Sequence, residues 1–378
     1  MEASIWGFDP LISNHYLSKT FMIKRRSLLK SGAAAAIAAP ALTGFAQQTV
    51  TLKFHTFMAP QSNVWLNMHK AWMSKVEKES GGRIKFEAYP AMQLGGTPVQ
   101  LYDQARDGVV DIVWTLPGNT AGRFPRVEVF ELPFMMTNAE AASKAYWEYV
   151  QTMAPDEFKE TQLIALHVHG PGAIHTVDKP VRSVADLKGL KMRAPTRQVT
   201  KLLGALGAIP VGMPLPGIPD ALSKGTINGA VIPWEVVPAV KVNELTKFHA
   251  EFDPAGGCLY TTTFVMVMNK AKYNSLPPDL KKIIDNNSGI ETSGWLGKVQ
   301  QDGDVPGRKT ASDRNNTIFT VGPVEAQEFR RKSRALEIEW LEDMNKRGYD
   351  GRKLLDSARS LIEKHSKAPA AKAPAKKA

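Results

Sequence analysis

The sequence predicts an α/β fold in two lobes with a cleft between them. Three observations support this prediction. The chain has 378 residues, more than one typical domain, and 43% of them are hydrophobic, as in folded globular proteins. Strand-like and helix-like patterns alternate along most of its length. A strong strand pattern returns at residues 261–268, after a second run of alternation, and indicates a chain that crosses between two sheets.

The first sheet is predicted from the beginning of this alternation. Residues 50–55 alternate between apolar and polar side chains, as in a half-buried strand. Residues 60–80 form a helical pattern, ended by Gly81-Gly82, whose apolar face holds Val64, Trp65, Met68, Trp72 and Val76. A strand, a helix and a strand follow at residues 84–89, 99–106 and 109–114. This βαβαβ order predicts a parallel sheet with helices on both faces.

The second alternation predicts the other lobe. It begins with a strand pattern at residues 163–169. A strand, two helices and a strand follow at residues 190–193, 198–207, 220–224 and 227–232. From residue 279 to residue 365 the pattern is mostly that of long helices, so we expect the chain to end in a helical part.

Both ends of the chain are predicted to lie outside the folded body. Lys24-Arg25-Arg26 precedes an Ala-rich run and a small-residue site at Gly44-Phe45-Ala46, which is the order of an export signal. The adjacent arginines indicate the twin-arginine type, and Met22 is a candidate start. Residues 367–378 are a Lys/Ala/Pro tract with nothing to bury, and we expect them to be disordered.

Composition and motifs argue against several functions. The net charge of +11 arises largely in the two ends, so the body offers no basic stripe for nucleic acid. The single cysteine, Cys258, excludes an internal disulfide and a Cys-based zinc site. The sequence lacks a run of about 18 apolar residues and the common catalytic and phosphate-binding motifs. We therefore expect ligand binding rather than turnover, with no catalytic residue, no cofactor and no metal.

Three histidines leave two interpretations open. His167 and His169 lie two apart on one predicted strand and share a face, with His175 nearby, so a metal site is conceivable. No carboxylate or fourth ligand is spaced to join them. We favour hydrogen bonding within a core or cleft, and we include His169 among the expected pocket residues.

Five groups of residues occur in a specific order between about residues 50 and 350. They are Gly81-Gly82-Arg83-Ile84 with Tyr89-Pro90 and Gln93-Leu94-Gly95; Phe124-Pro125 with Glu131-Leu132-Pro133-Phe134; Asp186-Leu187-Lys188-Gly189-Leu190-Lys191-Met192-Arg193-Ala194-Pro195; Ala221-Leu222 with Gly225, Asn228-Gly229 and Pro233; and Asn269-Lys270 with Leu276-Pro277 and Asp279-Leu280. In this order they resemble the solute-binding proteins of TRAP (tripartite ATP-independent periplasmic) transporters, the C4-dicarboxylate-binding family.

The resemblance implies the two-lobed fold of periplasmic binding proteins, with crossing strands, a long inter-lobe helix and a helical C-terminal part. It also implies a periplasmic protein that captures an organic acid and delivers it to the membrane subunits of a TRAP permease. On that fold we expect a signal peptide at residues 1–46, lobe I (first part) at 47–168, lobe II at 169–259, a return to lobe I with the connecting helix at 260–322, C-terminal helices at 323–366 and the tail at 367–378.

Arg193 is the ligand anchor that the resemblance implies, because the family's Arg at this position holds the ligand carboxylate. A planar guanidinium can donate two parallel hydrogen bonds to a carboxylate. The family's second Arg is replaced here by Ala173, and its Asn before Pro233 is Ile232. A lost charge and added apolar surface predict a monocarboxylate with an apolar or aromatic body. The full set of expected ligand-binding residues is Arg193, Trp234, Trp114, Phe57, Thr115, Leu116, His169, Leu215, Ile232 and Glu235.

Alternatives remain at this point. Phe57 and Leu215 are equally compatible with packing inside the lobes. The protein could instead serve an ATP-driven importer, which the gene for a neighbouring permease would decide, or be an exported enzyme, which turnover of a bound acid would reveal.

Overall fold

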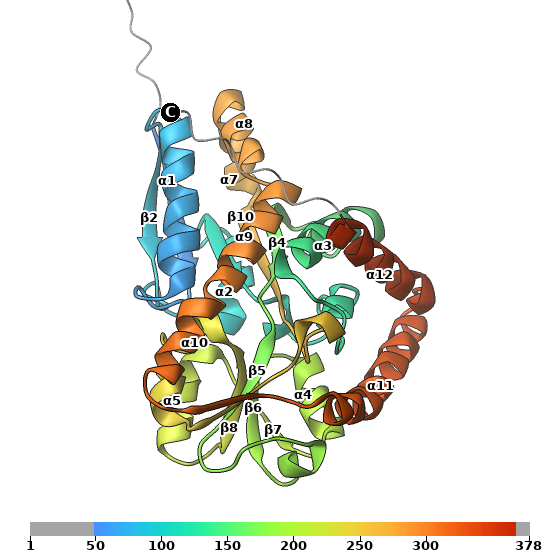
Figure 1. Cartoon of the computed structure of the whole chain (residues 1–378). Coiled ribbons are helices and arrows are strands. Elements are labelled where there is room, and N and C mark those ends of the chain that lie inside the picture. Colours follow the sequence, from blue (N-terminus) through green and yellow to red (C-terminus); the bar gives the residue numbers. More distant parts are fainter. Residues whose placement is uncertain (1–48, 368–378) are drawn as a thin grey trace, which may run out of the picture. The chain divides into compact units, whose positions relative to one another are not determined.

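The computed structural model describes residues 49–367, and within them the strands form two sheets, of five and six strands (Figure 1). The predicted signal at residues 1–46 and the predicted tail from residue 368 onward lie outside the described residues. None of the described helices combines the length and the apolar character that a membrane crossing requires.

The first sheet has the strand order β2-β1-β3-β10-β4. Its parallel part joins β1 to β2 and to β3, as the βαβαβ pattern predicts, whereas β10 is antiparallel to both of its neighbours. The sheet is therefore mixed, because β10 enters it from the opposite lobe. The strands are β1 (Val50–Thr56), β2 (Ile84–Tyr89), β3 (Ile112–Thr115), β4 (Thr161–Val168) and β10 (Thr263–Asn269).

The second sheet has the strand order β11-β9-β5-β8-β6-β7. The last strand in sequence, β11, falls within the range 260–322 that we expected to return to lobe I, yet it pairs with β9 of the second sheet. The strands are β5 (Gly172–Thr176), β6 (Lys191–Ala194), β7 (Ile209–Gly212), β8 (Gly229–Pro233), β9 (Phe248–Glu251) and β11 (Thr317–Thr320).

Helices cover both sheets. The predicted helix at residues 60–80 consists of a π-helical segment, η1 (Val64–His69), continued by an α-helix. The α-helices are α1 (Lys70–Glu79), α2 (Leu101–Arg106), α3 (Ala139–Met153), α4 (Arg197–Ala205), α5 (Ile218–Ser223), α6 (Val242–Leu245), α7 (Lys270–Ser275), α8 (Pro278–Asn286), α9 (Ile290–Asp302), α10 (Asp304–Ser312), α11 (Pro323–Lys346) and α12 (Gly351–Lys367).

Two short segments of the chain, without an intervening α-helix, cross between the sheets. The first leaves β4 at Val168 and enters β5 at Gly172, and the second leaves β9 at Glu251 and enters β10 at Thr263. Residues in and beside these crossings lie where the two sheets meet. The crossing strands of the predicted fold are therefore present, and they position the site described below.

The helix α11 links the two lobes. Its Phe329 and Leu336 pack in an apolar core with residues of the second sheet, such as Met192 and Val231. Its Trp340 donates a hydrogen bond from Nε1 to the carbonyl of Pro125 at 3.1 Å. The next helix, α12, packs against α3 beside the first sheet (Figure 1). A second link runs through α9 and α10, which are separate helices that meet at Gly303.

Candidate functional site

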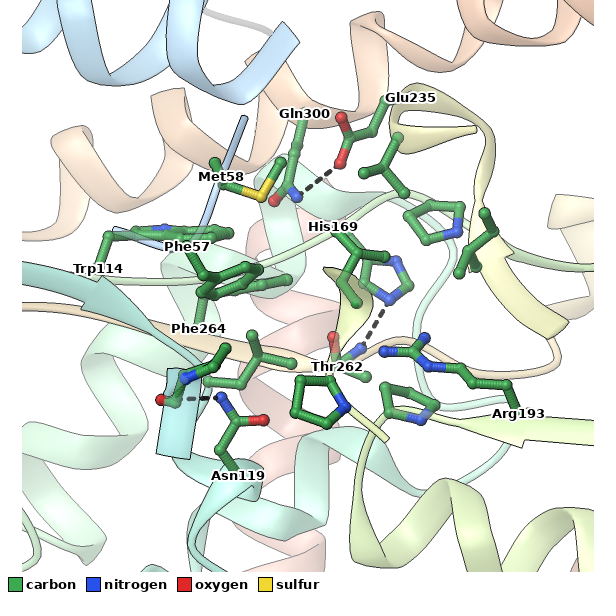
Figure 2. A pocket seen from close by; sticks show the side chains of 18 of the residues that line it. Phe57, Met58, Trp114, Asn119, His169, Arg193, Glu235, Thr262, Phe264 and Gln300 are labelled. Carbon is green, nitrogen blue, oxygen red and sulfur yellow. Dashed lines mark hydrogen bonds between the residues drawn. The ribbon is translucent and has the colours of Figure 1, made fainter. Parts of the chain in front are cut away.

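A cavity lies where the two sheets meet (Figure 2). Its wall contains residues of β3 and β10 from the first sheet and of β6 and β8 from the second. The space open to the centre of a water-sized sphere is about 50 Å³, so the walls of the cavity lie close together. Any molecule held there touches both lobes.

Arg193 supplies the positive charge of this cavity. It lies on β6 between β7 and β8, and only 4% of the residue is exposed. Its Nε donates to the carbonyl of Met213 at 3.0 Å and its Nη1 to that of Val231 at 3.2 Å. It forms no ion pair with a described residue, and burial lowers the pKa of Arg193 to about 10. A desolvated cation held by neutral carbonyls is a site for an anion.

Tyr260 adds an unused donor to the same wall. Its hydroxyl is buried without a hydrogen-bond partner among the described residues, and burial raises the pKa of the phenol. A Cβ on Gly172 would come within 2.0 Å of the Tyr260 ring, so only glycine leaves room for the ring there. Because a buried donor without a partner costs about 1–3 kcal/mol, a ligand oxygen would relieve this cost.

His169 is neutral and fixed by two backbone groups. Its Nε2 accepts a hydrogen bond from the backbone N–H of Thr262 at 3.1 Å, so the proton lies on Nδ1, which faces the carbonyl of Gly170. Burial, together with nearby Arg193, lowers the pKa of His169 to about 4. The ring therefore ties the two crossing segments together, as Figure 2 shows for His169 and Thr262.

Aromatic rings form one side of the cavity. Trp114 stacks on Phe264 with centroids 4.5 Å apart and planes 11° apart, and Phe57 lies 5.3 Å from Trp114. The Nε1 of Trp114 donates to His167 Nε2 at 2.7 Å, which fixes the indole. Flat rings packed this way offer a flat ligand a complementary surface.

Two polar side chains lie on the side of the cavity away from Arg193, beyond His169 (Figure 2). Gln300 of α9 donates from Nε2 to Glu235 Oε1 at 2.9 Å. Burial raises the pKa of Glu235 to about 7, although the hydrogen bond from Gln300 lowers it in part. The remaining oxygens of this pair, Glu235 Oε2 and Gln300 Oε1, are buried without partners among the described residues.

Most of the residues expected in the pocket line this cavity. They are Phe57, Trp114, Leu116, His169, Arg193, Leu215, Ile232 and Glu235. Sequence reasoning missed several others, among them Met58, Asn119, Tyr260, Thr262, Phe264 and Gln300. Tyr260, Thr262 and Phe264 lie in the second crossing and at the start of β10, so the predicted strand at residues 261–268 was a signal that could have found them.

Two expected pocket residues lie outside this cavity. The Trp234 ring packs on His175 and His249, and its Nε1 donates to Glu251 Oε1 at 2.7 Å. It faces a separate hollow, because Trp234 and Glu235 are consecutive in one turn of 3₁₀-helix and point to different sides. Thr115 follows Trp114 on β3, so it points to the opposite face, where its Oγ1 donates to the carbonyl of Pro98 at 3.3 Å.

The three histidines considered for a metal have separate partners. His167 accepts from Trp114, and His169 bonds Thr262 and Gly170. His175 Nδ1 lies 2.7 Å from His249 Nδ1, on a different sheet from His167. Among residues 49–367, no three His, Cys, Asp or Glu side chains gather as a metal site.

The chain matches a known protein family and is similar to solved structures. Residues 55–343 match the family described as bacterial extracellular solute-binding protein, family 7. A TRAP solute-binding protein from Rhodoferax ferrireducens, solved in complex with copurified benzoate, is 74% identical, with 85% of this chain and 100% of that chain covered and a TM-score of 0.84. One from a marine metagenome, described as specific for aromatic acid ligands and solved with 3-hydroxybenzoate, is 49% identical, with 85% and 100% covered and a TM-score of 0.83.

A more distant structure has the same fold. The TRAP periplasmic solute-binding protein of Bordetella bronchiseptica, solved with both enantiomers of mandelate, is 25% identical, with 83% of this chain and 99% of that chain covered and a TM-score of 0.76. The predicted two-lobed fold, the periplasmic location and the partnership with a TRAP permease are confirmed, and the alternative of an ATP-driven importer is not supported. The chain belongs to family 7 of the bacterial extracellular solute-binding proteins, the receptors of TRAP transporters.

Proposed function

We propose that this receptor captures a monocarboxylate with an aromatic body, of the benzoate class, and delivers it to its permease. The observation that carries the proposal is Arg193, a buried guanidinium without a carboxylate partner among the described residues. Of the described residues that line the cavity, Arg193 is the only Arg or Lys. One cation neutralises one carboxylate, so the site suits a monocarboxylate better than a dicarboxylate.

The rest of the cavity supports an aromatic body. Trp114, Phe264 and Phe57 form a flat wall, and Leu116, Leu215 and Ile232 add apolar surface. Burial of apolar area contributes about 25 cal/mol per Å², whereas the hydroxyls of a sugar acid would find few partners on such walls. The two of these structures with the highest sequence identity hold benzoate and 3-hydroxybenzoate, which are of the same class.

The position of the family's second Arg supports the same conclusion. Ala173 occupies it here, on β5 opposite Ile232 of β8. Directly paired residues of antiparallel strands share a face of the sheet, but the short side chain of Ala173 borders the separate hollow with Trp234 and does not line this cavity. A second positively charged side chain, which could bind a second carboxylate, is thus absent from the described residues of this wall.

Native mass spectrometry of gently purified protein, followed by calorimetric titration, tests this function. We expect a copurified acid of the benzoate class, binding of benzoate, and no measurable binding of succinate or galactonate. Tighter binding of succinate than of benzoate would overturn the proposal.

We also propose that the receptor does not transform its ligand. Among the described residues that line the cavity, no acid–base pair lies beside Arg193, and His169 uses both of its ring nitrogens on backbone groups. Recovery of bound benzoate unchanged after long incubation would agree with this proposal, and a new product in the protein's presence would contradict it.

A further inference from the structure

We propose that Glu235 and Gln300 bind a hydrogen-bond donor on the body of the ligand, so that the receptor prefers aromatic acids carrying a hydroxyl or amino group. This inference rests on the proposed function, because it takes the ligand carboxylate to lie on Arg193. It adds a hydrogen bond between the pair and the end of the ligand opposite its carboxylate.

The first support is the pair of unpartnered acceptors. Glu235 and Gln300 both line the cavity, with 4% and 2% of each residue exposed. Gln300 Nε2 satisfies only Glu235 Oε1, at 2.9 Å, and leaves Glu235 Oε2 and Gln300 Oε1 without a described partner. Buried oxygens are rarely left unpaired in native structures, and each exception calls for an explanation. A donor on the ligand supplies that explanation.

The second support is that the pair is held in place. The backbone N–H of Glu235 donates to Asp304 Oδ1 at 2.9 Å. A Cβ on Gly303 would lie 3.0 Å from Glu235 Cβ, and one on Gly307 would lie 2.0 Å from the Trp234 carbonyl oxygen. These two glycines let α9 and α10 approach the turn that carries Glu235. The backbone and Cβ of Glu235 are therefore held in place by packing, and its Oε1 is held by Gln300.

The charges around the pair favour a neutral donor over a second acid. Burial raises the pKa of Glu235 to about 7, so near neutral pH a large share of the molecules carries a carboxylate there. Hydrogen bonding by Gln300 and by Asn63 lowers this pKa in part, and Asn63 Nδ2 also donates to the carbonyl of Val299 at 3.2 Å. A second ligand carboxylate would meet negative charge, whereas a hydroxyl or amino group would donate to either free oxygen. Gln300 Oε1 stays an acceptor in both protonation states of Glu235.

The geometry allows one ligand to reach both ends. Figure 2 shows Arg193 on one side of His169 and the Glu235–Gln300 pair on the other, with the aromatic wall alongside. Both ends border the same cavity. A flat acid with its carboxylate on Arg193 therefore directs the opposite part of its ring toward the pair.

The test is a calorimetric series with the unmodified receptor. We compare benzoate with its three monohydroxy isomers, and each isomer with the fluorobenzoate substituted at the same carbon, which is similar in size but cannot donate. We expect at least one hydroxy isomer to bind about tenfold more tightly than benzoate, and its fluoro counterpart to bind like benzoate.

A double variant of Glu235 and Gln300 tests whether this pair causes the preference. Glu235→Leu together with Gln300→Leu removes both partners at once, so no new unpaired group remains. We expect this double variant to bind benzoate and the hydroxy isomer with similar affinity, so that the preference for the hydroxy isomer is lost. Asn119→Ala is the matched control, because Asn119 lines another part of the cavity and its Nδ2 bonds Thr115 Oγ1 at 3.4 Å. It should change the affinities for both acids by the same factor.

Three results would overturn the inference. They are equal binding of benzoate and all hydroxy isomers, equal gains from fluoro and hydroxy groups, and loss of the preference in Asn119→Ala instead of the double variant. In each case benzoate binding through Arg193 would still uphold the proposed function. Failure of every aromatic acid to bind the parent would overturn the proposed function as well.

Discussion

The Nη1 of Arg193 donates a hydrogen bond to the backbone carbonyl of Val231 at 3.2 Å, across the junction of β6 and β8. A second carbonyl, that of Met213, accepts from Nε at 3.0 Å. These bonds fix the direction of the guanidinium but provide no opposite charge. The receptor therefore holds a desolvated cation in a preset orientation, and we propose that a ligand carboxylate supplies the missing partner. Preset orientation lowers the entropic cost of binding.

Tyr260→Phe should weaken binding without harming the free protein. The hydroxyl of Tyr260 has no described partner, so its removal leaves nothing unpaired in the unliganded receptor. If it donates to the ligand carboxylate, its loss should cost about 1.5–3 kcal/mol of binding, or roughly tenfold or more in Kd. Calorimetry with benzoate and urea unfolding of the free protein measure the two effects. A destabilised free protein with unchanged affinity would assign the hydroxyl a structural role instead.

Gly307→Ala should destabilise the contact between α10 and the turn that carries Glu235. The added Cβ would lie 2.0 Å from the Trp234 carbonyl oxygen, so the helix must move. Overpacking of this kind costs about 1–3 kcal/mol in the free energy of unfolding. The control is Gly204→Ala within α4, where a Cβ meets nothing within 4 Å. It should raise the free energy of unfolding by about 0.5–1 kcal/mol, and a similar loss in both variants would refute the packing argument.

The histidine pair beneath Trp234 should make the fold sensitive to acid. His249 Nε2 accepts from Asn316 at 3.0 Å, so its Nδ1–H donates to His175 Nδ1, and His175 Nε2–H donates to the carbonyl of Ile232 at 3.1 Å. Burial lowers the pKa of His175 to about 4, and burial with nearby His175 and Arg308 lowers that of His249 to about 2. A second proton on His175 Nδ1 would break its hydrogen bond with His249, and one on His249 Nε2 would break its hydrogen bond with Asn316.

The sign of the effect follows from these pKa values. Below the ordinary value of 6.5 the unfolded chain binds a proton that the folded His249 does not, so stability falls as pH drops from 6.5 toward the folded pKa. Each such histidine contributes up to about 1.4 kcal/mol per pH unit. His249→Asn should therefore flatten the decline between these pH values. Urea unfolding as a function of pH measures this, and parallel curves for parent and variant would contradict it.

Much of the fold was predictable from local patterns. The parallel pairing of β1 with β2 and β3 follows from the alternation of strand and helix patterns that ends at Trp114. The end of α1 follows from Gly81-Gly82. The mixed character of the sheet was not predictable in this way, because β10 reaches its place between β3 and β4 only after the chain has built the second lobe. The pairing of β11 with β9 depends on a similar long-range return.

The site residues also fall into those that the sequence predicted and those that it did not. Arg193 and Trp114 both followed from the resemblance to the family, and both line the cavity. The prediction for Trp234 was wrong because sequence alone does not say which of two neighbours in a tight turn faces the cavity. In the structure Glu235 faces it, and Trp234 faces the separate hollow. Gln300 was missed because it lies in the middle of α9, where its helix position gives no sign that it meets Glu235, 65 residues earlier.

The most direct test of the account is calorimetric titration of benzoate into the parent receptor and into Arg193→Ala. Removing the guanidinium leaves a desolvated carboxylate without its partner, which should cost about 2–5 kcal/mol, or roughly 30-fold to several thousand-fold in Kd. Arg193→Lys should restore only part of this loss, because a point charge cannot reproduce the planar fork. Equal affinity of the parent and Arg193→Ala for benzoate would show that the guanidinium is structural and would contradict the central claim.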